Sequence, residues 1–199
     1  MFEIAEYIGI IAFAISGFFV AVRSKLDFLG VLISVFLTAL GGGILRDIVV
    51  DKTPYTFTHD TPAMIVLGVM VLLILFRFHK RDSIENRPLF IVSDSIGLIS
   101  FSITGTLIAI EAGLNLTGIV ALSFVTAVGG GIIRDIIINE IPFVFKTGFY
   151  GTISILVSLI LYALNKVEMI TFYPIAVVFV LGVSLRVVAY YKKWAIPLI

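Results

Sequence analysis

Cysteine is absent from the 199 residues of the sequence, which excludes disulfides, thiolate metal sites and a cysteine nucleophile. Charge is scarce as well: only 14% of the residues are charged, against about 25% in an ordinary soluble domain. The 14 Lys and Arg nearly balance the 13 Asp and Glu, so the chain lacks a basic field that would bind a nucleic acid. Phosphate loops, nucleophile elbows and metal-ligand spacings are also missing. We therefore expect no enzyme, no metal site, no cofactor and no soluble partner.

Apolar residues, in contrast, make up 60% of the chain and give it a mean hydropathy of +1.16. An apolar surface of that size must face a lipid bilayer, and a spanning helix takes about 20 such residues. The apolar runs are continuous, unlike the alternating strands of a membrane barrel. We therefore predict an all-α integral membrane protein with a single transmembrane domain, residues 1–199. Its seven transmembrane helices are expected at residues 3–22, 28–50, 62–78, 89–110, 116–138, 147–165 and 171–190.

An internal repeat is the most informative feature of the sequence. The octapeptide at residues 41–48, Gly-Gly-Gly-Ile-Leu-Arg-Asp-Ile, reappears with one change at residues 129–136. Each repeat contains three helices, which is an odd number. The second copy must therefore enter the membrane from the opposite side, which makes it an inverted repeat. We assign repeat one to residues 1–87, repeat two to 89–168 and an extra helix to 171–191. The same shift of 88 positions relates Gly9 to Gly97, Phe13 to Phe101, Gly17 to Gly105 and Pro54 to Pro142.

The loop charges predict the orientation in the membrane, because Lys and Arg accumulate on the cytoplasmic side. With the N-terminus outside, the outer loops hold only Lys52 and Lys166. The first apolar run has no basic start, so we expect a retained span and not a cleaved signal peptide. The C-terminus is then cytoplasmic, and the inner loops and tail hold Arg23, Lys25, Arg77, Lys80, Arg81, Arg87, Lys146, Arg186, Lys192 and Lys193.

Each repeat carries a glycine triplet inside an apolar helix, where every glycine costs roughly 1 kcal/mol relative to alanine. We expect the second and fifth helices to bend or unwind there, at about mid-membrane, which would expose backbone carbonyls to a cation or a helix N-terminus to an anion. The alternative is that the glycines only let two helices pack closely. The residues concerned are Gly41, Gly42, Gly43, Gly129, Gly130 and Gly131.

Charged residues directly after the triplets are expected to pair or to face water, because a charge at the bilayer centre costs at least about 2.5–3.5 kcal/mol. The symmetry of the repeat predicts two pairs between the repeats, Arg46 with Asp135 and Arg134 with Asp47. These four residues either fix the repeats to each other or act in a pore or a gate, and one role does not exclude the other.

Other polar residues recur at matching positions of the two repeats. We interpret Asp94 as lining the mouth of a cation path, and its counterpart Glu6 as an interfacial charge among lipid headgroups. Hydroxyl groups on the first, second, fourth and fifth helices can replace the hydration shell of an ion, although each can also form an ordinary helix–helix hydrogen bond. The candidate pore-lining hydroxyls are Ser16, Thr38, Thr104 and Thr126.

Two three-helix repeats, a seventh helix and the doubled Gly-Gly-Gly-Ile-x-Arg-Asp motif resemble the prokaryotic branch of the trimeric intracellular cation (TRIC) channels, a family also labelled with a "glycine transporter" domain. The resemblance implies a homotrimer in a prokaryotic plasma membrane. It also implies one pore inside each protomer, between the first, second, fourth and fifth helices. The permeant ion is then a monovalent cation, chiefly potassium. Carried over, both glycine triplets are the pore kinks, and the Arg-Asp pair after each triplet lies beside its kink.

Two other functions remain open from the residues alone. Inverted repeats with broken helices are equally typical of secondary transporters, and a helix N-terminus with an arginine would suit the carboxylate of a small amino acid such as glycine. A purely structural membrane subunit is the third possibility, and the charges within the apolar helices argue against it.

Overall fold

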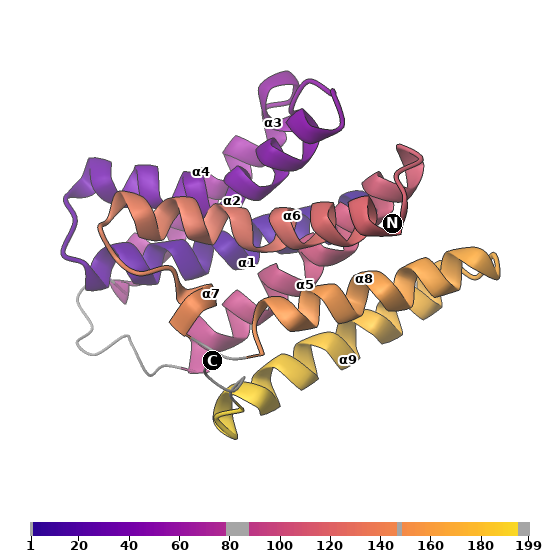
Figure 1. Ribbon diagram of the computed structural model, residues 1–199. Coiled ribbons are helices and arrows are strands. Elements are labelled where there is room, and N and C mark those ends of the chain that lie inside the picture. The colour runs from indigo at the N-terminus through magenta and orange to yellow at the C-terminus, as the bar shows by residue number, and fades with distance from the viewer. Residues whose placement is uncertain (1, 79–87, 147–148, 195–199) are drawn as a thin grey trace.

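The computed structural model describes residues 2–78, 88–146 and 149–194, and the secondary structure of these ranges is helical throughout. Figure 1 shows the helices in chain order. Their bounds are α1 Phe2–Arg23, α2 Phe28–Val49, α3 Tyr55–Thr58, α4 Thr61–Leu75, α5 Pro88–Glu111, α6 Leu116–Ile137, α7 Phe143–Lys146, α8 Gly151–Lys166 and α9 Phe172–Tyr191.

Five of the described helices, α1, α2, α5, α6 and α9, are long and apolar enough to cross a membrane. The predicted all-helical membrane protein is therefore confirmed. The third and sixth predicted spans correspond to α4 and α8, which are apolar but shorter, with 15 and 16 residues. Many large apolar side chains on the outer surface are exposed, as a chain that passes the bilayer several times requires.

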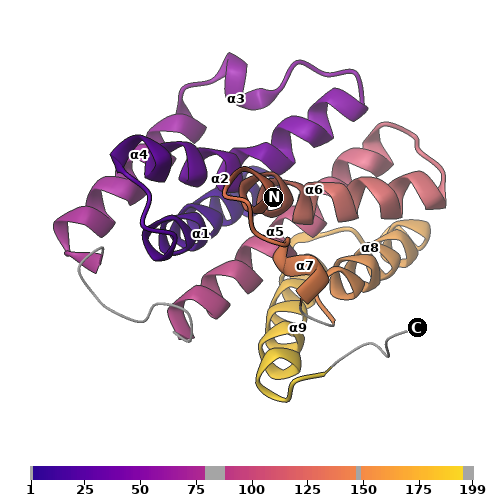
Figure 2. The same ribbon diagram turned by 60° about the vertical axis from the view of Figure 1, so that its left-hand side comes forward.

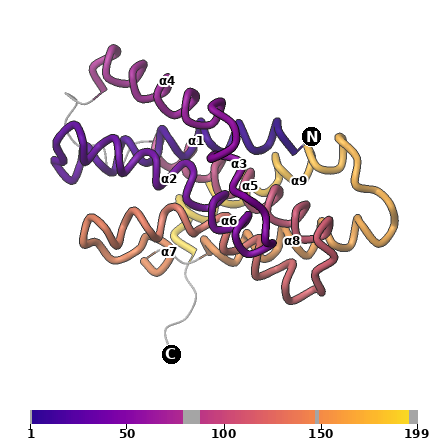
Figure 3. The backbone as a smooth tube through the Cα atoms, turned by 90° about the horizontal axis from the view of Figure 1, so that it is seen from above, coloured from indigo at the N-terminus to yellow at the C-terminus, as the bar shows by residue number. Residues whose placement is uncertain are grey.

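Four helices, α1, α2, α5 and α6, form the centre of the bundle and contact one another extensively. Helix α4 packs against α1 and α2, whereas α8 packs against α5 and α6 on the opposite side (Figures 2 and 3). Helix α9 packs on α5 and α8. The central four helices correspond to the first, second, fourth and fifth predicted spans, so the residues singled out in the sequence all lie on the central helices.

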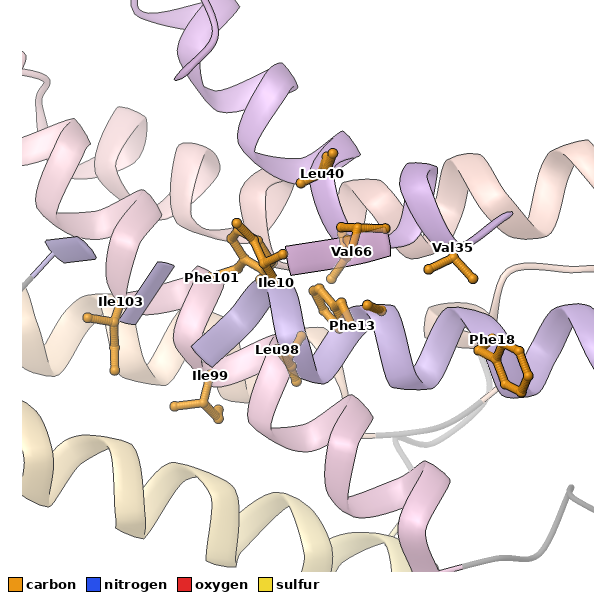
Figure 4. Packing of buried hydrophobic residues seen from close by; sticks show 14 of the residues in the cluster. Ile10, Phe13, Phe18, Val35, Leu40, Val66, Leu98, Ile99, Phe101 and Ile103 are labelled. Carbon is orange, nitrogen blue, oxygen red and sulfur yellow. The ribbon is translucent and has the colours of Figure 1, made fainter. Parts of the chain in front are cut away.

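The contact between α1 and α5 is built from the same two residue types on each side. The ring of Phe13 covers Gly97, where any Cβ would overlap it, and the ring of Phe101 lies against Gly9. The two rings stack with centroids 5.3 Å apart (Figure 4). Because lipid is as apolar as these side chains, close van der Waals packing holds the helices together here.

Equivalent residues also start the second helix of each repeat. The Asp27 carboxylate accepts a hydrogen bond from the backbone N–H of Gly30 at 2.7 Å, and Asn115 accepts one from Gly118 at 2.9 Å. Each side chain satisfies one of the backbone donors that a helix start leaves free. The shift of 88 residues seen in the sequence thus recurs in the local structure.

Candidate functional site

Helices α2 and α6 meet at their glycine triplets. A Cβ added at Gly42 would overlap the carbonyl oxygen of Thr126, and one added at Gly130 would overlap that of Thr38. A Cβ at Gly41 would lie 3.2 Å from the Cα of Gly130. The two backbones therefore touch directly, and only glycine allows this approach.

The expectation that the helices unwind at the triplets is wrong. Each of α2 and α6 is one α-helix that includes its triplet, Gly41–Gly43 or Gly129–Gly131. The carbonyls thus stay within the helical hydrogen-bond pattern and are not released toward an ion. The cost of three glycines is offset by the close contact between two helix backbones, which is the alternative that the sequence left open.

A first cluster of charges lies at the end of α2 and consists of Glu6, Arg46 and Asp47. Arg46 Nη1 donates to Glu6 Oε2 at 2.6 Å and to Thr104 Oγ1 at 3.2 Å, while its Nε donates to Asp47 Oδ1 at 2.8 Å. The other oxygen of Asp47 accepts from the backbone N–H of Tyr55 at 2.9 Å and so anchors α3. All three charged side chains are buried, and each has an oppositely charged partner.

A second cluster, consisting of Asp94, Arg134 and Asp135, lies at the end of α6. Arg134 Nε donates to Asp135 Oδ1 at 2.8 Å, and the second oxygen of Asp135 accepts from the backbone N–H of Phe143 at 2.8 Å, at the start of α7. Asp94 accepts a hydrogen bond from Ser16 at 3.2 Å. The contacts of Asp135 reproduce those of Asp47 at the 88-residue shift. Two contacts differ: among the described residues Nη1 of Arg134 has no counterpart of the bond from Arg46 to Glu6, and Ser16 binds the carboxylate, whereas its equivalent Thr104 binds the arginine.

The predicted pairs between the repeats, Arg46 with Asp135 and Arg134 with Asp47, are wrong. Each arginine instead binds the aspartate that follows it in the same helix. An arginine side chain is long enough to turn back onto its neighbour, and the aspartate is held in place by the backbone donor of the next short helix. Within the two clusters, the hydrogen bonds that join the repeats run from Arg46 to Thr104 and from Ser16 to Asp94.

Two further expectations need correction. Glu6 is not an interfacial charge among headgroups: it is only 4% exposed and forms an ion pair with Arg46. Arg186 is not a charge of the cytoplasmic tail, because it belongs to α9 and is 1% exposed. Three other basic residues of the predicted inner loops, Lys80, Arg81 and Arg87, lie outside the described residues.

Arg186 is the functional candidate that the sequence reasoning missed. Its guanidinium lies 4.7 Å from the ring centre of Tyr150, and the rings of Phe143 and Tyr190 are within 6 Å. It also acts electrostatically on Asp94, as does Arg134. The available signal was its position inside an apolar helix, which its closeness to the basic residues at the C-terminus hid.

The predicted pore-lining hydroxyls are buried in the centre of the bundle. Thr38 donates to the carbonyl of Ser34, and Thr126 donates to that of Leu122, in each case at 2.6 Å and within one helix. Thr104 and Ser16 contact the two charge clusters, as described above. Asp94 is 3% exposed, so it lies inside the bundle at the end of a helix and not at an open mouth. Contact of these residues with an ion stays a prediction.

A cavity of about 170 Å³ lies beside the second cluster. Its polar lining includes Arg134 and Asp135, Arg23 at the end of α1, Lys146 at the end of α7, and Glu140 between α6 and α7. The Lys146 ammonium lies 2.8 Å from Glu140 and holds the pKa of that carboxyl below its usual range. Within the described ranges no three Asp, Glu or His side chains are grouped to hold a metal ion. The buried Arg134 and the charged residues at the ends of α1 and α7 therefore line the same cavity.

Comparison with known proteins agrees with the sequence motifs. The family model described as a glycine transporter matches residues 3–78 and 91–166. One solved structure, described as the structural basis for conductance through TRIC cation channels, is 34% identical in sequence and superposes with a TM-score of 0.85. The match covers 100% of this chain and 97% of the chain in that structure. The chain belongs to the TRIC family. A prokaryotic TRIC channel crystallised in 0.5 M KCl is 27% identical, with a TM-score of 0.88 and 98% of both chains covered.

Bacterial relatives of known sequence are also named membrane proteins. The UPF0126 membrane protein YvgT of Bacillus subtilis is 33% identical over 195 residues, which is 98% of this chain and 95% of that protein. A UPF0126 membrane protein of Deinococcus radiodurans is 40% identical over 137 residues, which is 69% of this chain and 63% of that protein. The TRIC chain described here is therefore a multi-pass membrane protein like these relatives.

Proposed function

We propose that this chain is a channel for monovalent cations, with potassium as the permeant ion and one pore inside each protomer of a homotrimer. The observation that carries the proposal is a set of buried hydroxyl groups inside an otherwise apolar bundle. We propose that these groups line one path. Serine and threonine side chains on the four central helices are almost fully enclosed, although lipid-facing helices have no need of them. They are Ser16, Ser34, Thr38, Ser100, Ser102, Thr104, Thr106, Ser123 and Thr126.

The charge of the two clusters favours a cation. Each cluster combines two carboxylates with one guanidinium. Acidic groups are therefore in excess at the first cluster, and at the second cluster the two carboxylates offset Arg134 together with Arg186 of α9. Cation channels commonly use acidic side chains in this way. Hydroxyl dipoles without a cage of carboxylates suit a monovalent ion better than calcium, which takes 6–8 oxygen ligands, usually with carboxylates among them.

The internal repeat indicates how the ion path is oriented across the membrane. We propose seven spans arranged as two inverted three-helix repeats plus α9, with the N-terminus outside and the C-terminus cytoplasmic. The first cluster then lies near the outer face and the second near the inner face, because α2 and α6 cross the membrane in opposite directions. An ion would pass both clusters in turn.

The glycine contact between α2 and α6 lies between the clusters. In our proposal these two triplets are the constriction of the pore, and the helices bend or separate there when the path opens. Glycine is suited to this because its missing side chain leaves little packing to break. The hydroxyls of Thr38 and Thr126, one turn before the triplets, would then turn from their own helix backbone toward the ion.

Flux into liposomes tests the proposal against the secondary transporter. Purified protein in liposomes should carry potassium down its gradient and should show no saturable uptake of glycine. Glycine uptake that saturates and depends on a proton or sodium gradient, without potassium flux, would instead support the transporter. Liposomes that hold protein inactivated by heat control for leakage. Light scattering in detergent measures the oligomer, for which we expect a trimer.

A further inference from the structure

The two clusters are equivalent in sequence but not in their contacts. Arg46 Nη1 donates to Glu6, whereas Nη1 of the equivalent Arg134 is buried without a hydrogen-bond partner among the described residues. Asp94 stands where repeat one has Glu6, and its side chain is one methylene shorter. The oxygen of Glu6 lies 3.2 Å from the position of a Cβ on Gly43, while such a Cβ on Gly131 meets only the guanidinium of Arg134. The second carboxylate is thus drawn back from its arginine.

Helix α9 adds a charge to one cluster alone. It lies outside the repeat and packs on α5 and α8, so repeat one has no counterpart of Arg186. The side chain of Arg186 is 1% exposed, and its Nε and Nη1 have no hydrogen-bond partner among the described residues. The charge of Arg186 acts on Asp94, as does that of Arg134. Burying such a charge is costly unless opposite charges compensate it, so a buried arginine within a membrane helix marks a candidate functional residue.

The formal charges of the two ends follow directly. Without α9 each cluster has two carboxylates and one guanidinium, and therefore one negative charge in excess. With Arg186 the second cluster is neutral, while the first keeps its negative charge. A bundle that is nearly symmetric in helices and contacts is therefore asymmetric in electrostatic potential along the membrane normal.

We propose that Arg186 determines the direction dependence of conduction, by cancelling the excess negative charge at one end of the path. This inference rests on the proposed function as a cation channel. Cations that enter from the side of the first cluster meet a negative end, and those that enter from the side of the α9 C-terminus meet a neutral one. One unit charge about 4 Å from an ion, at the dielectric constant of water (about 80), changes the local occupancy of that ion roughly fivefold. The current should therefore rectify.

Single-channel recording in symmetric KCl measures this directly. For the unmodified protein we expect the larger current when cations enter from the side opposite the α9 C-terminus, with a ratio of about two or more between opposite voltages. The size of the ratio is independent of the direction of insertion. A C-terminal tag that protease reaches from one side assigns that direction. R186Q should give a nearly symmetric current–voltage curve, and R186K should rectify like the unmodified protein.

Variants of Asp94 separate charge from shape. D94N makes the second cluster positive and should increase the ratio, whereas D94N/R186Q restores neutrality and should return the ratio to that of the unmodified protein. A steric plug predicts instead that R186Q and the double variant behave alike. K192Q, an exposed charge at the end of the same helix, is the matched control and should leave the ratio unchanged.

The outcomes separate this inference from the proposed function. Potassium currents whose ratio is unchanged in R186Q, or in D94N, would overturn the role of Arg186 and leave the channel intact. Absence of any unitary current from the unmodified trimer would overturn the channel itself. Size-exclusion chromatography checks the assembly of each variant. If R186Q does not assemble, D94N still tests the inference, because it should increase the rectification ratio that R186Q should decrease.

Discussion

The guanidinium of Arg46 lies 2.6 Å from the carboxylate of Glu6, although the two residues belong to different helices, 40 positions apart in the chain. The pair is almost fully buried and joins the start of α1 to the end of α2. Without Glu6 the buried Arg46 would keep its bond to Asp47, but its Nη1 would lose a charged hydrogen-bond acceptor.

E6Q should therefore lower the free energy of unfolding by about 1.5–3 kcal/mol, the usual contribution of a hydrogen bond to a charged group. E111Q is the matched control, because Glu111 pairs with Lys52 at 3.0 Å but both side chains are largely exposed. Exposed pairs contribute about 0.2–1 kcal/mol, so the control should lose little. Unfolding of the two variants in mixed micelles by a denaturing detergent compares them, and equal losses would mean that Glu6 is solvated.

A double-mutant cycle tests which charges are partners. E6Q/R46Q should cost clearly less than the sum of its single substitutions, because both single substitutions remove the same direct contact between the two side chains. R46Q/D135N should be additive within about 0.5 kcal/mol, since these residues share no contact. Coupling in the second cycle and none in the first would restore the pairing between repeats that the sequence suggested.

Alanine at the glycine contact should be costly. G42A or G130A places a methyl group against a backbone carbonyl of the facing helix, and such overpacking costs typically about 1–3 kcal/mol. Potassium flux should fall, because the constriction is built on this contact. G68A is the control: a Cβ there meets nothing within 4 Å, so alanine should be neutral or slightly stabilising. Normal assembly and flux in G42A would show that the contact is not needed.

Each aspartate of the Arg-Asp motif should hold a short helix in place. Asp135 accepts from the backbone N–H of Phe143, so D135N should weaken the start of α7, Phe143–Lys146. Hydrogen exchange of the amide of Phe143 should accelerate in this variant, while amides in the centre of α6 stay protected. An unchanged exchange rate at Phe143 would mean that Asp135 binds Arg134 but does not hold the start of α7.

The orientation is tested by tags on one face or the other. A tag after residue 80 and one at the C-terminus should be cytoplasmic, and a tag near Gly113 should be external, because Lys and Arg are concentrated on the inner side. Tags after residue 80 and near Gly113 on the same side would remove the inverted repeat from the account.

Much of the fold was predictable because apolar runs and turn residues determine where helices can cross a membrane. The predicted span 28–50 corresponds to α2, Phe28–Val49, and 116–138 corresponds to α6, Leu116–Ile137. The α1–α5 and α2–α6 contacts follow from glycines at matching places in the two halves.

Side-chain partners were less accessible to sequence reasoning. The symmetry suggested ion pairs between the repeats. However, a backbone N–H already fixes the aspartate next to each arginine, so this aspartate accepts a hydrogen bond from the arginine without further loss of its conformational entropy. Glu6 was assigned to the interface because it lies near the chain start. Arg186 was grouped with a basic tail, although helical burial depends on the neighbours of α9, which a single sequence does not reveal.

The reversal potential of single-channel current tests the central claim most directly. Purified trimers in planar bilayers, with a tenfold KCl gradient, should show discrete unitary currents that reverse close to the potassium equilibrium potential and far from that of chloride. Replacing potassium by calcium should leave little current. Reversal near the chloride potential would contradict the cation pathway, and saturable glycine uptake without unitary currents would replace the channel by a transporter.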